Sequence, residues 1–126
     1  MLNELAKITE SLLVQHNFVV WPKIGAFVVA RKQAELKDNG QFVPPIRFIS
    51  FNSKLSNNDG LLLNQYAIDH HTNYATSEKL YADFYQKFND TLNKGKAIVA
   101  NQFGTFKLNN GAIQFVSDSA LKLSSP

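Results

Sequence analysis

Two glycine-containing stretches, 79 positions apart, constrain the fold of this chain more than any other feature. Residues 24–27 read IGAF and residues 103–106 read FGTF, each inside a strand-like apolar run, so that Gly25 corresponds to Gly104. Glycine is favoured where a chain must bend sharply between two strands. We therefore predict that the chain contains two copies of one unit, in which a helix and a short strand lead into a glycine bend and a hairpin.

A second offset supports the repeat and locates an insertion. Ile113 and Phe115 match Ile49 and Phe51 at an offset of 64, which is fifteen shorter than the offset between the glycines. The difference predicts that the first copy carries an extra β-arm that the second copy lacks.

The coarse order of elements follows from hydrophobic periodicity and from turn signals. Helices are expected to start at Asn3, acting as a cap, and at Thr76, Ser77 and Glu78, with Gly95 as a left-handed C-terminal cap. The expected elements are a helix over 2–17, strands at 18–21 and 26–33, an arm over 34–46 with its turn at 38–40, a strand at 47–52, helices at 61–71 and 76–94, a strand at 96–100, a hairpin over 101–117 that turns at 109–111, and a final helical turn in 118–126. This order predicts an α+β fold with a three-stranded antiparallel sheet in each unit.

Composition excludes several classes of site. The chain has 126 residues and no cysteine, so disulfides, thiolate metal sites and cysteine nucleophiles are excluded. The apolar runs are too short to span a bilayer, which predicts a soluble, cytoplasmic segment without membrane contact of its own. Two independent units of about sixty residues would each be marginally stable, which favours units that share one core.

No recognisable enzyme motif is present. The adjacent His70 and His71 would point about 100° apart on a helix and are a poor pair of metal ligands, so a role at a helix C-terminus is favoured. Gly25 and Gly104 stand alone and form no phosphate-binding loop. We therefore predict no catalytic residues, no metal, no cofactor and no small-molecule substrate.

Charge is concentrated around the predicted arm. The net charge is +3, and residues 15–54 hold six Lys and Arg side chains against two acidic ones. Such a distribution fits a weak polyanion-binding surface, and it equally fits exposed lysines that only keep the strands soluble.

These motifs resemble the HU and integration-host-factor superfamily of small DNA-wrapping proteins. The resemblance is carried by IGAF at 24–27, the arm from Arg31 to Pro45, FISFNSKL at 48–55 and FGTF at 103–106. More closely, PPIRFISFN followed by NDGLL resembles the tandem HU-like module at the N-terminus of bacterial SPOR-domain proteins, which bind peptidoglycan. This resemblance implies a cytoplasmic module that precedes a membrane anchor, with units 1–57 and 58–126 packed as an internal pseudo-dimer; an exchanged homodimer is the alternative.

Two functions are compatible with the resemblance. In the first, the arm is a non-catalytic surface that tethers a protein partner in the cytoplasm or at the cell envelope or division site. In the second, the arm binds duplex DNA with its basic side chains and a proline wedge. The candidate residues of the arm are Arg31, Lys32, Lys37, Phe42, Pro44, Pro45 and Arg47. The basic residues and the prolines would serve DNA binding, and the apolar residues from Phe42 to Ile46 would serve a protein partner.

Overall fold

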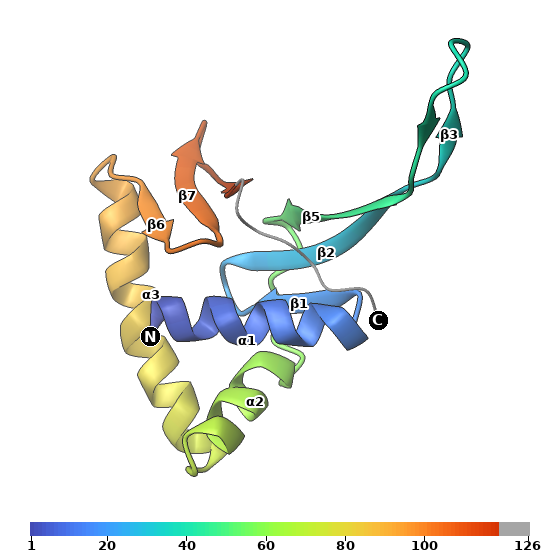
Figure 1. Ribbon diagram of the computed structural model, residues 1–126. Helices are drawn as coiled ribbons and strands as arrows, with labels where there is room; N and C mark the ends of the chain where they lie inside the picture. Colours follow the sequence, from blue (N-terminus) through green and yellow to red (C-terminus); the bar gives the residue numbers. More distant parts are fainter. Residues whose placement is uncertain (119–126) are drawn as a thin grey trace.

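Two three-stranded antiparallel sheets and three helices make up the fold (Figure 1). The structure is a computed structural model that describes residues 1–118. The predicted α+β class is confirmed, and the helical turn expected at the C-terminus lies largely at 119–126, outside the described residues. In chain order the elements are α1 (Leu2–Gln15), β1 (Phe18–Trp21), β2 (Gly25–Lys32), β3 (Glu35–Leu36), β4 (Phe42–Val43), β5 (Ile46–Asn52), α2 (Leu61–Asp69), α3 (Tyr74–Asn93), β6 (Ile98–Ala100), β7 (Gly104–Asn109) and β8 (Ala112–Ser117).

The cap of α1 differs from the sequence prediction. Asn3 lies inside the helix, which begins at Leu2 after the N-cap Met1, and no side chain caps it. Instead, the Asn3 side chain accepts a hydrogen bond of 3.1 Å from the Asn101 backbone N–H. This contact joins the first turn of α1 to the loop between β6 and β7.

The start of α3 was also predicted wrongly, because the helix begins at Tyr74, two residues before Thr76. Asn73 is the cap, and its side chain accepts a hydrogen bond of 2.8 Å from the Thr76 N–H. Ser77 is buried instead and donates to the Leu63 carbonyl of α2 at 3.0 Å. At the other end of the helix, the predicted left-handed glycine is confirmed, since Gly95 has a φ of 82°.

Each sheet follows the same path. The strand orders are β1-β2-β5 and β6-β7-β8, and every neighbouring pair is antiparallel. Phe27 lies opposite Phe51 in the first sheet, and Phe106 lies opposite Phe115 in the second. The two pairs occupy the positions that the offsets of 79 and 64 relate.

The turn before each glycine also has the same geometry in both sheets. Ile24 N–H donates to the Trp21 carbonyl at 3.0 Å, and Phe103 N–H donates to the Ala100 carbonyl at 3.1 Å. Within these turns, Lys23 and Gln102 both have a positive φ, of 65° and 59°. A non-glycine residue rarely adopts this conformation, so its occurrence 79 residues apart is a close structural correspondence.

One hydrophobic core spans both halves of the sequence. Trp21 from the first sheet stacks on Phe103 from the second, with ring centroids 6.2 Å apart and planes at 3°. Phe27 contacts Phe103 and Phe115 at 5.2 Å and 5.0 Å. Each fully buried aromatic ring contributes about 1.5–3 kcal/mol through removal from water, so neither half could lose the other without exposing much of its core.

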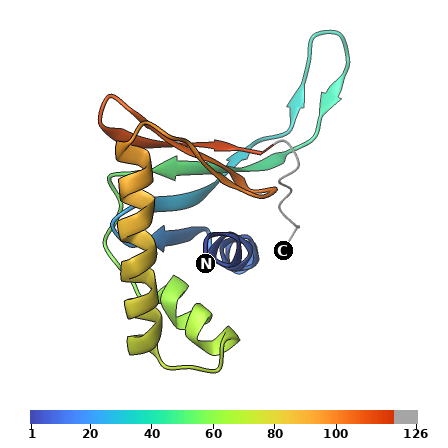
Figure 2. The same cartoon turned by 90° about the vertical axis from the view of Figure 1, so that its left-hand side faces the viewer.

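α1 and α2 lie on one side of the sheets, α3 runs from α2 to β6, and the arm projects away from the helices (Figures 1 and 2). In Figure 2, α1 is seen end-on, with α2 below it and the arm at the opposite side of the molecule. Within the core, the Trp21 indole N–H donates to Thr9 Oγ1 of α1 at 2.8 Å. Both groups are buried, so this bond fixes α1 against the first sheet.

The halves differ in what covers their helices. α2 packs against α1, where Ile8 and Leu12 line the seam between the two helices. At an offset of 79, the corresponding residues of α3 are Lys87 and Thr91. α2 also packs against α3, but near the N-terminal end of α3, where Ser77 donates to a backbone carbonyl of α2, so these polar residues further along α3 need no apolar cover.

Candidate binding site on the arm and between the sheets

The arm is a continuation of β2 and β5 in one unbroken register. Lys32 pairs with Ile46 at the end of the first sheet, and Leu36 pairs with Phe42 near the tip. The sum of paired residue numbers stays the same along the whole ribbon, so no residue is inserted or lost between the two ladders. Alternate residues therefore keep their faces from the base of the arm to its tip.

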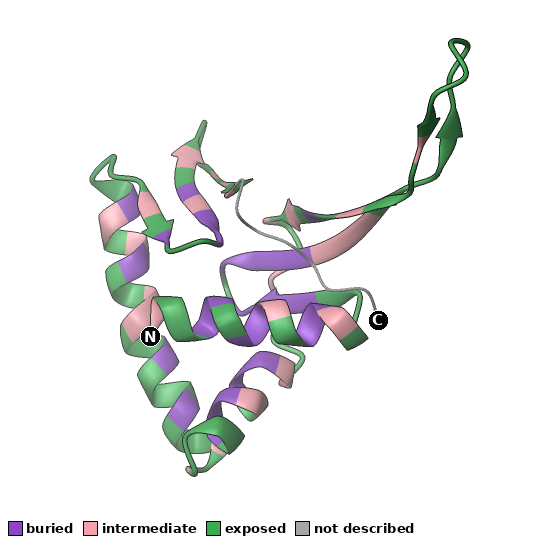
Figure 3. Cartoon of the chain, viewed as in Figure 1, coloured by how far each residue is buried: buried purple, intermediate pink, exposed green. Residues whose placement is uncertain are grey.

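A tight turn closes the arm where the sequence predicted it. Lys37 N–H donates to the Gln41 carbonyl at 2.8 Å, and Gln41 N–H donates to Asn39 Oδ1 at 3.0 Å. Gly40 has a φ of 82° in this turn, with no other atom close to where a Cβ would lie. The turn is held by its own hydrogen bonds, and the arm extends into solvent (Figure 3).

One face of the arm is apolar. It is the face that points away from α1, and large side chains on it are strongly exposed, with Leu36 at 76% and Phe42 at 65%. Ile46 and Phe48 continue the same face along β5 at 51% and 48%, and Phe18 of β1 borders it at 38%. We call this surface the apolar arm face; its residues are Phe18, Ala30, Lys32, Ala34, Leu36, Phe42, Pro44, Ile46 and Phe48.

The opposite face of the arm is polar and carries both arginines. Arg31 lies directly opposite Arg47 in the register. Arg31 is exposed, whereas Arg47 is half-buried at the base of the arm and donates to the Leu13 carbonyl of α1 at 3.2 Å. Arg47 therefore helps to fix the arm to the end of α1.

The predicted arm residues consequently divide between the two faces. Phe42, Pro44 and Lys32 lie on the apolar arm face, and the others, Arg31, Lys37, Pro45 and Arg47, alternate onto the polar face. The two prolines have no ladder partner and sit between β4 and β5, at mid-arm and away from the tip. The structure thus does not gather the four basic residues into one patch.

The two repeat glycines are required by close packing. A Cβ on Gly25 would overlap the Phe51 ring and would lie 2.9 Å from the Asn52 carbonyl oxygen. A Cβ on Gly104 would overlap the Phe115 ring in the same way. Each glycine therefore allows the phenylalanine of the third strand to fold over the second strand and into the shared core.

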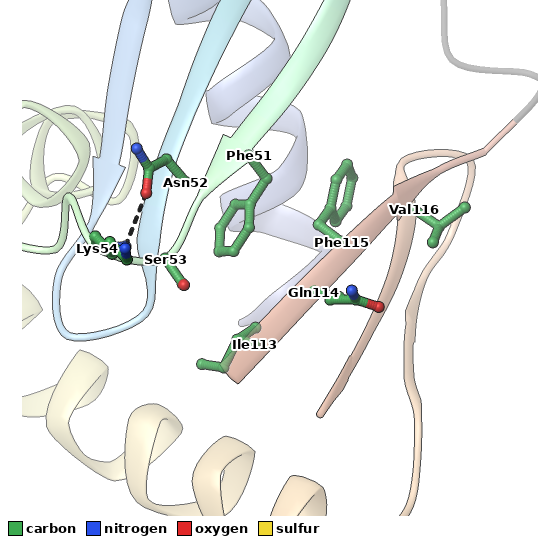
Figure 4. Close-up of a pocket in the computed structure, with 8 residues that line it drawn as sticks. All are labelled: Phe51, Asn52, Ser53, Lys54, Ile113, Gln114, Phe115 and Val116. Carbon is green, nitrogen blue, oxygen red and sulfur yellow. Dashed lines mark hydrogen bonds between the residues drawn. The ribbon is translucent and has the colours of Figure 1, made fainter. Parts of the chain in front are cut away.

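A groove of about 430 Å³ lies between the edge strands β5 and β8 (Figure 4). It is lined by residues 51–54 and 113–116. Figure 4 shows Phe51 and Phe115 directed towards each other between the strands, and their ring centroids are 6.1 Å apart. Sequence reasoning did not find this groove, although the offset of 64 that relates the two phenylalanines was the available signal.

Two further titratable residues, His70 and Tyr81, have structural partners. His70 ends α2, stacks on Tyr66 with centroids 4.1 Å apart and contacts the Glu4 carboxylate. Tyr81 donates to the Pro22 carbonyl at 2.7 Å, and burial raises the pKa of its hydroxyl. Within residues 1–118 there is no group of three or more metal-ligating side chains.

Comparison with known families places the first half of the chain. Residues 2–59 match the model of the family described as CCDC81-like prokaryotic HU domain 1, and this similarity supports an HU-like module in this part of the chain. No curated protein and no solved structure shows significant similarity to the chain. Among the described residues, no helix is long and apolar enough to cross a membrane.

Proposed function

We propose that this chain, built on an HU-like module, is a non-catalytic tethering domain that binds a protein partner through the apolar arm face. The observation that carries the proposal is the exposure of Leu36 and Phe42, which form a cross-strand pair far from the core. Exposed apolar surface of this extent is a mark of interaction sites. A ribbon that projects from the body also offers its backbone edges to a partner.

We further propose that the two halves, 1–57 and 58–126, form an internal pseudo-dimer. The equivalent turns at Lys23 and Gln102, the equivalent clearances at Gly25 and Gly104, and the shared aromatic core support this arrangement. The pseudo-dimer would give the arm a rigid base, because β2 and β5 are anchored in a core that neither half completes alone.

The place of the module in a longer protein is part of the same proposal. The resemblance to SPOR-associated modules suggests a cytoplasmic position ahead of an envelope anchor. In that position, a domain that holds a cytoplasmic partner would link it to the cell envelope or the division site.

Duplex DNA is the second candidate, favoured by the exposed cationic side chains of Arg31, Lys32 and Lys37. The chain would bind DNA with one arm and not with a two-armed clamp, because the second hairpin closes at Asn110–Gly111 without an arm. Arg31 and Arg47 lie on the face opposite to the apolar arm face. A groove-binding arm would therefore use the polar face, with Pro45 as its apolar wedge.

Two measurements with matched variants separate these functions. Affinity capture compares the wild type with Leu36→Ser/Phe42→Ser and with Val43→Ser, which removes an apolar side chain from the opposite face of the ribbon. We expect captured proteins to be lost only with the double variant. Identical capture by the double variant and the wild type would count against the protein-binding function.

The DNA measurement is a titration of labelled duplex DNA at about 50 mM and about 200 mM salt. Contacts between basic side chains and phosphates are much weaker at the higher salt concentration. We expect weak binding that changes little in Leu36→Ser/Phe42→Ser. Tight, salt-steep binding that Arg31→Ala and Lys32→Ala abolish would instead establish the DNA function.

A further inference from the structure

We propose that the partner of the apolar arm face is the same face of a second copy of this chain, so that two arms pack against each other face to face. This inference rests on the proposed protein-binding function and identifies the bound partner as a second copy of the chain. It follows from the register of the ribbon, the exposed apolar area and the shape of the arm.

The apolar arm face is continuous and nearly uncharged. Because the register is unbroken, Phe48, Ile46, Pro44 and Phe42 follow one another on one strand, opposite Ala30, Lys32, Ala34 and Leu36 on the other. Lys32 is the one charged residue of the apolar arm face, and its ammonium group can extend past the edge of a contact while its methylene groups remain buried. The apolar arm face of a second copy could therefore pack against it without burying a charge.

The exposed area fits a weak but specific self-association. The five large side chains of the face are between 38% and 76% exposed. With roughly 200 Å² for a residue of this size, these fractions leave at most about 550 Å² of surface on these residues in each copy. Two such faces would bury at most about 1,100 Å² in total, which lies at the low end for specific interfaces.

The shape of the arm favours another arm as the occupant. The arm is a narrow two-stranded ribbon that projects away from the body (Figures 1 and 2). Two ribbons of equal length can stack with their apolar faces about 10 Å apart, as sheets do in a sandwich. Their polar faces, which carry Arg31 and Glu35, would both remain in water, and a two-fold axis would make the contact self-complementary and closed.

Sedimentation velocity on the wild type and on two variants tests the proposal. We expect a reversible dimer with a dissociation constant on the order of 100 µM, as the small area implies. Leu36→Ser/Phe42→Ser should weaken it at least about ten-fold, because central apolar residues dominate such contacts. Val43→Ser, on the opposite face of the same ribbon, should leave the constant unchanged.

A mixed sample of labelled and unlabelled chains gives a second readout, since intermolecular nuclear Overhauser effects should join the Phe42 ring to Leu36 methyl groups of the other copy. A wild-type chain that stays monomeric up to about 1 mM overturns the proposal. A dimer that tolerates Leu36→Ser/Phe42→Ser, or that Val43→Ser weakens equally, overturns it as well.

The proposed function fails separately from this inference. If the wild type is monomeric but only the double variant loses its captured proteins, the arm still binds a protein partner and the second copy is the wrong occupant. If the wild type dimerises through this face but capture is unaffected by the double variant, the tethering function is wrong and self-association stands.

Discussion

Replacing Gly104 with alanine should destabilise the fold strongly although only one methyl group is added. The new Cβ would overlap the Phe115 ring and would press against the Val116 carbonyl oxygen. Phe115 cannot move freely, because its ring contacts those of Phe27, Phe103 and Phe106 at centroid distances of 5.0–5.1 Å. Gly104→Ala therefore either strains the backbone or displaces a ring from the shared core.

The magnitude combines two effects. Overpacking of a well-filled core costs about 1–3 kcal/mol, and each aromatic contact that is lost removes about 0.5–1.5 kcal/mol. With partial relaxation we expect the free energy of unfolding to fall by about 2–4 kcal/mol, out of the 5–15 kcal/mol typical of a domain. Gly25→Ala should cost a similar amount, because its Cβ would overlap the Phe51 ring.

Urea denaturation followed by fluorescence of Trp21, the single tryptophan, measures this change. Gly40→Ala is the control: nothing lies near the position of its Cβ, so only the strain of its positive φ, about 1 kcal/mol, is expected. If Gly104→Ala destabilises the protein no more than Gly40→Ala does, the packing explanation for the repeated glycine is wrong.

Two further variants test individual contacts. Tyr81→Phe should lower stability by about 1–3 kcal/mol at neutral pH, because it leaves the Pro22 carbonyl without its donor. Burial raises the pKa of Tyr81 above its usual value near 10, so the folded state retains the proton and the wild type should lose stability above about pH 10. In urea denaturation at rising pH, the free energy of unfolding should fall less in Tyr81→Phe than in the wild type. An equal fall in both proteins would contradict this reasoning. Asn73→Ala removes the cap of α3, whose side chain accepts from Thr76, and should cost about 1 kcal/mol in the same assay; an unchanged midpoint would show that the cap does not stabilise the helix.

Local patterns in the sequence predicted most of the elements. The alternation of Phe48 and Ile49 gave the faces of β5, and the structure confirms it, with Ile49 buried and Phe48 half-exposed. The spacing of Gly25 and Gly104 indicated two equivalent bends, and both glycines begin the second strand of their sheet. These features depend on neighbours that are close in sequence, which periodicity can detect.

The errors concern contacts between distant parts of the chain. Asn3 looked like a helix cap, but its side chain is used by Asn101, and no local signal distinguishes the two roles. The start of α3 offered several capping residues, and the competing Ser77 is buried against α2. Burial of this kind depends on tertiary packing, which local propensity does not report.

The candidate site was predicted only in part. The sequence located the arm and its residues, but it treated Arg31, Lys32, Lys37 and Arg47 as one basic set. The register assigns Lys32 to the apolar arm face, and the carbonyl of Leu13 holds Arg47 at the base. Which face a residue occupies depends on pairing across the ribbon, and a one-residue change of register would have reversed the assignment.

Native-state hydrogen exchange tests most directly whether the two halves share one core and unfold as one unit. The slowest amides of β2 and of β7 should exchange through the same global opening, with free energies equal within about 1 kcal/mol. The opening free energies of both sets of amides should also decrease with urea concentration at the same slope. Amides of β7 that exchange through a separate opening, at a much lower free energy than those of β2, would contradict the account.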